Sequence, residues 1–237
     1  MRNTVNIAVR QLRSYFDGPA AYIVMFLVLL VVGGLFWWYF FLIGKAVSRE
    51  MFVWMTRVMV VGAPAITMGL LSEEERSGTM ELLMSMPLRE SQVVLGKFLG
   101  AFGLYSVLVL LTLPHPIAVD SLGDLDWGPV FSGYVGLLLL GAAAIGIGLM
   151  MSSLTRNQLV AFFLSFFTLA VLWLVPLAFN MLMSGTWASL FQAISLEGQV
   201  ENMARGVIDT RGVVYFLSLT LFSLAGAFAA VESRRWR

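Results

Sequence analysis

Long apolar runs, separated by short polar connections, make up most of the chain. A helix needs roughly 20 apolar residues to cross the bilayer core, and the charge-free stretches of the sequence supply six segments of that kind. The pattern therefore predicts an all-α polytopic membrane protein. We expect its six transmembrane helices at residues 20–43, 51–71, 97–117, 129–151, 159–181 and 213–231.

The second run carries two interruptions. Arg57 lies near one end of the predicted span, where a long side chain can reach the interface. Pro64 lacks a backbone donor, so we expect it to kink the helix. This span is accordingly the least regular of the six.

The first residues predict a separate helix over positions 2–16. Apolar and polar side chains recur there at helical spacing, which is typical of an amphipathic helix lying along the membrane surface. The apolar side is Val5, Val9, Leu12 and Phe16, and the polar side is Arg2, Asn6, Arg10 and Arg13. A short basic tail that only sets the orientation of the protein is the alternative.

A charged island lies between the second and third runs. Residues 72–97 hold eight of the 29 charged residues, and such a segment cannot lie in hydrocarbon. The spacing of Met80, Leu83 and Met84 predicts a short amphipathic helix in the island, with Pro87 at its end. We expect residues 72–96 to project into the cytosol as a coupling region.

Two further expectations concern the same island. Ser77 or Thr79 can cap the start of its helix, and a second helix begins near residues 89–91 and continues into the third span. The amphipathic helix could serve as a docking site for a soluble partner. The alternative is a solvated loop whose apolar stripe lies on the membrane. The residue pattern by itself leaves both interpretations open.

The composition excludes several classes of function. Charged residues make up 12% of the chain, far below the quarter expected of soluble proteins, and mean hydropathy is +0.86. The net charge of +1 predicts no nucleic-acid partner. The absence of cysteine excludes disulfides, thiolate metal sites and cysteine nucleophiles. The charge-free run at residues 18–44 is too long for the apolar core of a cleavable signal.

The distribution of basic residues predicts the orientation. With six spans, both termini lie on the same side, and ten basic residues fall on that side. Five fall on the other side, namely Lys45, Arg49, Arg57, Arg205 and Arg211. By the positive-inside rule both termini are expected in the cytoplasm, with residues 182–212 forming an extracytoplasmic segment.

The sequence shows no motif for an energy source of its own, neither ATP hydrolysis nor ion coupling. It lacks a G-x-x-x-x-G-K-[ST] phosphate loop, so we expect no ATPase activity on this chain. We expect no buried Asp, Glu or Lys in the spans, which argues against ion coupling. His115, between two prolines at the outer end of the third span, is interpreted as an interface or loop residue.

Bound metals and cofactors are not expected either. The 14 methionines are scattered through the chain, which favours packing over copper handling. Asp120, Asp124 and Asp126 are interpreted as a solvated outer loop. No Ser-His-Asp order or H-E-x-x-H motif supports proteolysis.

Small residues mark where helices should touch. Gly96 and Gly100 form a G-x-x-x-G at the start of the third span, and Gly141 and Gly146 lie in the glycine-rich fourth. Such residues let helix backbones approach closely in lipid. They predict a compact six-helix bundle, but leave open which faces pack within the chain and which form a dimer.

Three segments resemble ABC-2 type permeases. The run EEERSGTMELLMSMPLRESQVVLGKFLGA is similar to the family's glutamate-rich signature, and SSLTRNQLVAFF, at 152–163, is similar to its second cytosolic contact. ENMARGVIDTRGVVYFLSL, at 201–219, resembles the outer segment of the gliding-motility-associated branch; another branch serves copper-enzyme maturation. Relatives often carry an acidic residue where this chain has Gly212.

The resemblance implies which residues dock on a separate ATP-binding subunit. The primary candidates are Glu73, Glu75, Arg76, Gly78, Thr79, Glu81, Leu82, Leu83 and Pro87. The secondary candidates are Thr155, Asn157 and Gln158.

It also implies an assembly. A single ABC-2 type membrane domain over residues 1–237 would pair with a second half, as a homodimer, and with two ATP-binding subunits that hold ATP and Mg. The expected location is the bacterial inner membrane, with room for a periplasmic or membrane accessory protein.

Two outputs are open within this reading: export of a hydrophobic or lipid-linked substrate, and transmission of motion to a periplasmic partner. Residues 185–211 are expected to form an interfacial helix over the exit. A non-ABC six-span scaffold or a secondary carrier is the alternative to the whole interpretation.

Overall fold

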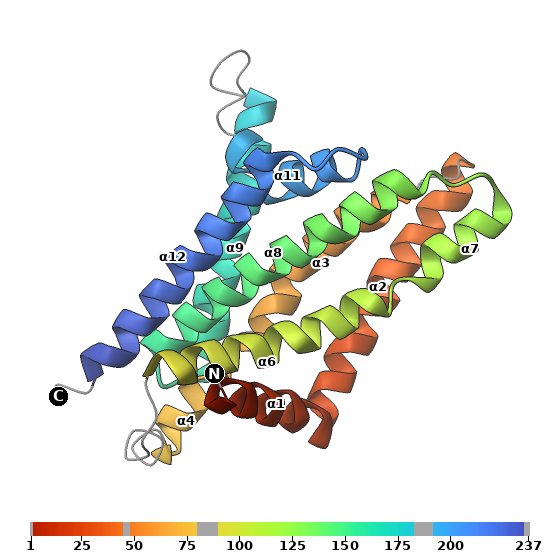
Figure 1. Ribbon diagram of the computed structural model, residues 1–237. Coiled ribbons are helices and arrows are strands. Elements are labelled where there is room, and N and C mark those ends of the chain that lie inside the picture. The colour runs from red at the N-terminus through yellow and green to blue at the C-terminus, as the bar shows by residue number, and fades with distance from the viewer. Residues whose placement is uncertain (1, 45–47, 80–89, 183–191, 235–237) are drawn as a thin grey trace.

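Every regular element that the structure describes is a helix. The computed structural model describes residues 2–44, 48–79, 90–182 and 192–234 (Figure 1). Within these ranges six helical segments are long and apolar enough to cross a membrane. Their main helices are α2 (Pro19–Ile43), α3 (Arg49–Thr67), α6 (Glu90–Leu110), α8 (Trp127–Leu154), α9 (Gln158–Leu182) and α12 (Thr210–Arg234). The predicted all-α, six-span fold class is confirmed.

The third span differs in shape from the prediction. The helix expected to begin near residues 89–91 and continue into the third span is confirmed, because α6 begins at Glu90, but the single helix expected over 97–117 is interrupted. α6 ends at Leu110, a turn follows, and α7 (Pro114–Leu122) continues the span. Two prolines explain the break, because a proline is tolerated in the first turn of a helix and not in its interior.

α7 contacts α2 through His115. His115 lies with its ring centroid 5.9 Å from that of Phe36 and 6.2 Å from that of Trp37 on α2. A Cβ added to Gly33 would lie 3.2 Å from His115 Nε2, so the two helices approach closely there. His115 is therefore a packing residue between two helices.

α8 is the central helix, with contacts to α3, α6, α9, α11 and α12. Its glycines receive a different neighbour at each level. Gly133 accommodates the Phe52 ring of α3, and Gly141 accommodates the Tyr105 ring of α6. Lower down, a Cβ on Gly146 would lie 3.3 Å from Ser223 Cβ of α12. The glycine-rich fourth span is thus used for packing inside the chain.

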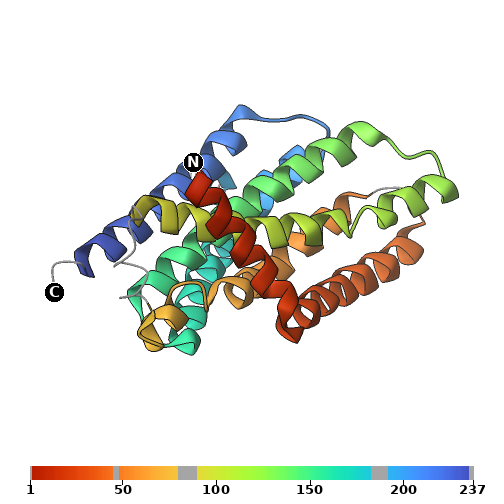
Figure 2. The ribbon, with the colours of Figure 1, turned by 60° about the horizontal axis from the view of Figure 1, so that its bottom comes forward.

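α1 (Arg2–Asp17) crosses α6 at a steep angle, as Figure 2 shows. Gly96 and Gly100 form the crossing, because an added Cβ would collide with Ile7 at the first position and Gln11 at the second. The predicted apolar side is therefore not the packing side: Val5 is 55% exposed and Val9 42%. α1 packs on protein with one face and presents its valines outward.

The two ends of the bundle carry different short helices. We call one the α4 end: α4 (Ser72–Arg76), α1, the first turns of α6 and the connection 155–157. We call the other the α11 end: α11 (Leu196–Met203), α7 and the start of α3. The first and the last described turns of the chain both lie toward the α4 end (Figure 1).

Candidate functional site

α4 is fixed to the end of the central helix. The Ser152 hydroxyl of α8 accepts hydrogen bonds from the backbone N–H of Leu71 and of Ser72, each 3.1 Å long. The same hydroxyl lies 3.0 Å from the Met68 carbonyl, to which it donates. Ser72 and Ser152 are both fully buried. A buried polar group costs little only when it is bonded, and here Ser152 satisfies the turn that leads into α4.

Lys97 joins three elements at the α4 end. It is only 3% exposed, and its Nζ lies 2.8 Å from Glu74 Oε1. Nζ also donates to the Leu70 carbonyl and lies 3.5 Å from Gln11 Oε1 of α1. The expectation of no buried lysine in the spans was wrong at this position. α1 covers the site, and hydropathy does not reveal such a cover.

An ion pair connects α4 with the connection between α8 and α9. Arg156 Nε lies 2.9 Å from Glu75 Oε1; the Arg156 side chain is 80% exposed and that of Glu75 only 12%. Asn157 caps α9 by accepting from Leu159 N–H at 2.9 Å. The two segments that the resemblance picked out thus form one continuous surface.

Most predicted docking residues that the structure describes face outward. Glu73, Arg76, Gly78, Thr79 and Asn157 are exposed. Thr155 and Gln158 are half-buried, and Glu75 is held inward by Arg156. Gly78 ends the turn after α4 with φ +71°, a conformation that side chains other than glycine adopt at a cost. Four candidates lie outside the described residues: Glu81, Leu82, Leu83 and Pro87.

A polar cleft of about 490 Å³ opens between α1 and α4. From the island it is lined by Glu73 and Glu74, and Lys97 lies at its base. From α1 it is lined by Asn3, Asn6, Ile7, Arg10, Gln11 and Ser14. The sequence interpretation missed the contribution of α1. The polar side chains at 3, 6, 10 and 14 share one helical face, and that spacing was the available signal.

Tyr15 fastens the second end of α1. Its hydroxyl donates to the Ile66 carbonyl of α3 at 2.8 Å. Burial raises the pKa of Tyr15 above its ordinary value, because the buried site disfavours the charged phenolate. α1 is therefore bound to α6 along its length and to α3 at its end.

The α11 end has a charged cluster of its own. Arg57 of α3 meets Glu197 of α11 through two bonds of 2.6 and 3.1 Å, and Trp173 Nε1 donates to Glu197 at 2.6 Å. Arg49 pairs with Glu201 one turn further along. Arg57 thus has a carboxylate partner inside the bundle and does not simply reach for the interface as expected.

α11 is packed into the bundle, unlike the interfacial helix expected over an exit. Leu196, Val200 and Met203 on its inner side are buried. Gly212 lets α12 pass beside it, because an added Cβ would lie 2.8 Å from Met203 Cε and 2.9 Å from Gln199 Oε1. A side chain at 212 would therefore require the ends of Met203 and Gln199 to shift. Residues 183–191 of the expected outer helix lie outside the described part.

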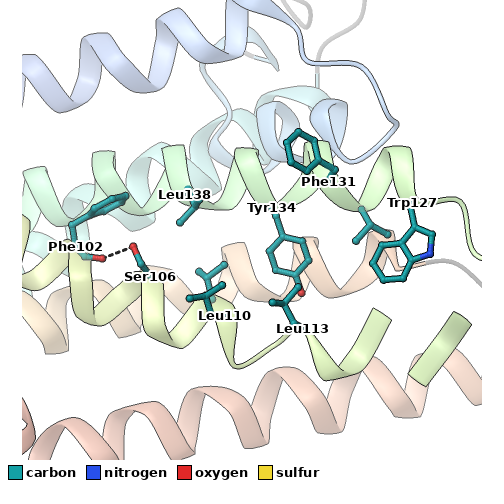
Figure 3. A pocket seen from close by; sticks show the side chains of 10 residues that line it. Phe102, Ser106, Leu110, Leu113, Trp127, Phe131, Tyr134 and Leu138 are labelled. Atoms are coloured by element: carbon teal, nitrogen blue, oxygen red, sulfur yellow. Dashed lines mark hydrogen bonds between the residues drawn. The ribbon is translucent and has the colours of Figure 1, made fainter. Parts of the chain in front are cut away.

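An apolar cavity of about 380 Å³ lies between α6 and α8, near the break before α7 (Figure 3). Tyr134 points from α8 toward Leu113, and its hydroxyl lies 3.0 Å from that of Thr112. The Ser106 hydroxyl bonds the Phe102 carbonyl of its own helix at 2.7 Å. With its hydroxyls satisfied, the cavity offers packing space and no reactive group. No cluster of three His, Asp or Glu side chains suited to a metal occurs among the described residues.

A comparison with protein families matches residues 38–221 to the ABC-2 family transporter protein family. The matched region runs from α2 into α12, so it contains α4, the connection 155–157 and α11. No curated protein matches the chain. Because the match covers well over half of the sequence, the chain belongs to the ABC-2 family and is a transporter membrane protein of the permease type.

Proposed function

We propose that this permease converts ATP hydrolysis on separate ATP-binding subunits into movement of its six-helix bundle, and that those subunits bind at the α4 end. Membership of the ABC-2 family supports an ATP-binding partner and a dimeric arrangement in general. It also removes the non-ABC scaffold as an alternative. The observation that carries the site is the single polar surface that α4, α1 and the connection 155–157 form together.

The contacts of α4 define the route by which a push would travel. Ser152 connects the turn before α4 to α8, Lys97 connects it to α6, and Arg156 connects it to the start of α9. α8 in turn contacts four other spans and α11. A displacement at the α4 end is therefore delivered to the central helix, and not only to a peripheral loop.

The orientation follows from charge. Ten of the 15 basic residues belong to segments that lead to the α4 end. At the α11 end, Arg49 and Arg57 are neutralised by carboxylates of α11. By the positive-inside rule the α4 end faces the cytoplasm.

The output at the α11 end is export of a hydrophobic or lipid-linked substrate. The apolar cavity beside the α6–α7 break supports a cargo without charge. Transmission of motion to a periplasmic partner, as in a gliding-motility-type system, is the competing output. Reconstituted transport into vesicles separates the two, because only the first output moves a substrate.

Gly78 offers a sharp test of the docking site. Gly78→Val strains the turn that follows α4, where φ is +71° and the space around the residue is open. We expect it to abolish stimulation of the ATP-binding subunit by this chain. The measurement is the ATPase activity of the co-purified complex, compared between the unsubstituted chain and the variant.

Gly44→Val is the matched control. Gly44 has φ +66°, also with nothing within 4 Å of an added Cβ, but it lies at the opposite end of the bundle after α2. Both substitutions carry the same backbone strain, so a loss of coupling with Gly78→Val alone places docking at the α4 end. Equal loss with both, or with neither, contradicts the proposal.

A further inference from the structure

The glutamate-rich island is far less acidic in the folded chain than in the sequence. Of its three consecutive glutamates, Glu74 is bound to Lys97 and Glu75 is bound to Arg156. Both carboxylates are drawn inward, with side chains 25% and 12% exposed. Glu73 alone remains an exposed acid in this run, next to the exposed Arg76.

Arginines dominate the exposed charges of α4, the connection 155–157 and the side of α1 that lines the cleft, among the described residues. Arg10 and Arg76 are exposed and have no ion-pair partner among the described residues. Arg156 uses Nε for Glu75, while its side chain stays 80% exposed. Among the described residues of these segments, three arginines therefore face outward against a single exposed carboxylate, Glu73.

The other exposed charges that the structure describes near this end do not line the cleft. Asp17 and Arg13 are on the second half of α1, toward α2, and Glu232 is in the last turn of α12. Counting them, exposed basic side chains still outnumber exposed acidic ones at this end among the described residues.

We infer that this chain uses Arg10, Arg76 and Arg156 to bind an acidic patch on the surface of the ATP-binding subunit. The inference rests on the proposed function and adds the chemistry of the partner to it. A guanidinium pairs with a carboxylate through two parallel hydrogen bonds, and complementary charge chiefly raises the rate of association. The partner is expected to supply Asp or Glu side chains opposite α1, α4 and residue 156.

The geometry of α1 separates this surface from the membrane. At 3.6 residues per turn, Arg10 lies about 100° to 140° around the helix from Val9 and Val5. Those valines are exposed and apolar, which is the character of a lipid-facing side. Arg10 instead lines the polar cleft with Glu73 and Glu74. Water and a soluble partner reach that side more readily than lipid headgroups do.

The test is the association rate of the purified ATP-binding subunit with this chain in nanodiscs. For the double variant Arg10→Glu with Arg76→Glu we expect association at least about tenfold slower at low salt. High salt should lower the association rate of the unsubstituted chain and narrow the difference in rate between it and the double variant. Glu73→Gln should have the opposite effect and speed association. Arg211→Glu, an exposed arginine at the other end, is the control that leaves the rate unchanged.

The outcomes are separable. If the unsubstituted chain binds no ATP-binding subunit, the proposed function fails with the inference. If it binds, but charge reversal and salt leave the rate unchanged, the acidic patch is wrong and the proposed function stands. Nanodiscs of neutral phosphatidylcholine and of anionic phosphatidylglycerol complete the design. If charge reversal slows association only in the anionic discs, the arginines are assigned to lipid headgroups and the inference is overturned.

Discussion

Glycines at helix crossings are the residues on which the packing of this bundle depends most directly. Gly141→Ala would place a methyl group into the Tyr105 ring, whose hydroxyl is fixed to the Leu137 carbonyl at 2.8 Å. Overpacking of this kind costs about 1–3 kcal/mol. Gly34→Ala is the control, since an added Cβ there meets nothing within 4 Å. Thermal unfolding in mild detergent should show destabilisation for the first variant only; equal stability contradicts the α6–α8 crossing.

Glu197 is the second residue with a decisive role. Glu197→Gln keeps the shape and the acceptor for Trp173 but removes the charge that faces Arg57. An unpaired, partly buried arginine should cost about 2 kcal/mol of stability. Glu201→Gln removes the partner of the more exposed pair, with side chains 33% and 34% exposed, and should cost less than about 1 kcal/mol. Urea or thermal unfolding measures both; a larger effect at Glu201 would be contrary to the structure.

Residue-level roles were only partly predictable. Glu73, Arg76 and Thr79 are exposed, as a docking surface requires, and their docking role stays a prediction. The inward roles of Lys97 and Glu75 did not emerge, because each depends on a partner far along the chain, Glu74 for the first and Arg156 for the second. Hydropathy scores a charge by its type and not by the partner that covers it.

At the scale of elements, α1 is the helix whose placement has the clearest functional consequence. Gly100→Ala would bring a Cβ to 2.6 Å from Gln11 Cβ and 3.0 Å from the Ala8 carbonyl, so α1 must shift off α6. Gly103→Ala lies one turn on and meets Leu12 only at an ordinary 3.4 Å. We expect faster hydrogen exchange along α1 for Gly100→Ala and an unchanged exchange rate for Gly103→Ala. Unchanged exchange in both would show that α1 does not depend on this crossing.

The elements show where periodicity succeeds and fails. Apolar length predicts the spans well, because the bilayer imposes a fixed thickness. The break between α6 and α7 follows from Pro114 and Pro116 but lies inside a continuous apolar run, so length alone passes over it. α1 was expected on its valine face and packs instead through Ile7 and Gln11. The groove formed by small residues on α6 determines which face of α1 packs, and the sequence pattern of α1 does not contain that information.

At the scale of the whole molecule, the chain joins two unlike ends through a central helix. The α4 end is polar and tied together by Lys97, Arg156 and Ser152. The α11 end is closed by Glu197 on Arg57. Because α8 contacts both α4 and α11, the bundle has the connectivity that a mechanical subunit needs. The family identifies the chain as a permease, and docking of a partner at the α4 end stays our proposal.

The most direct measurement uses the natural absence of cysteine. Thr79→Cys, exposed after α4, and Val207→Cys, 67% exposed after α11, each give the chain one thiol. A membrane-impermeant thiol reagent should label Thr79→Cys in inside-out vesicles only, and the bound ATP-binding subunit should protect it. Val207→Cys should react from the opposite side without protection. Labelling of Thr79→Cys from the outside, or its full reactivity in the assembled complex, would contradict docking at the α4 end.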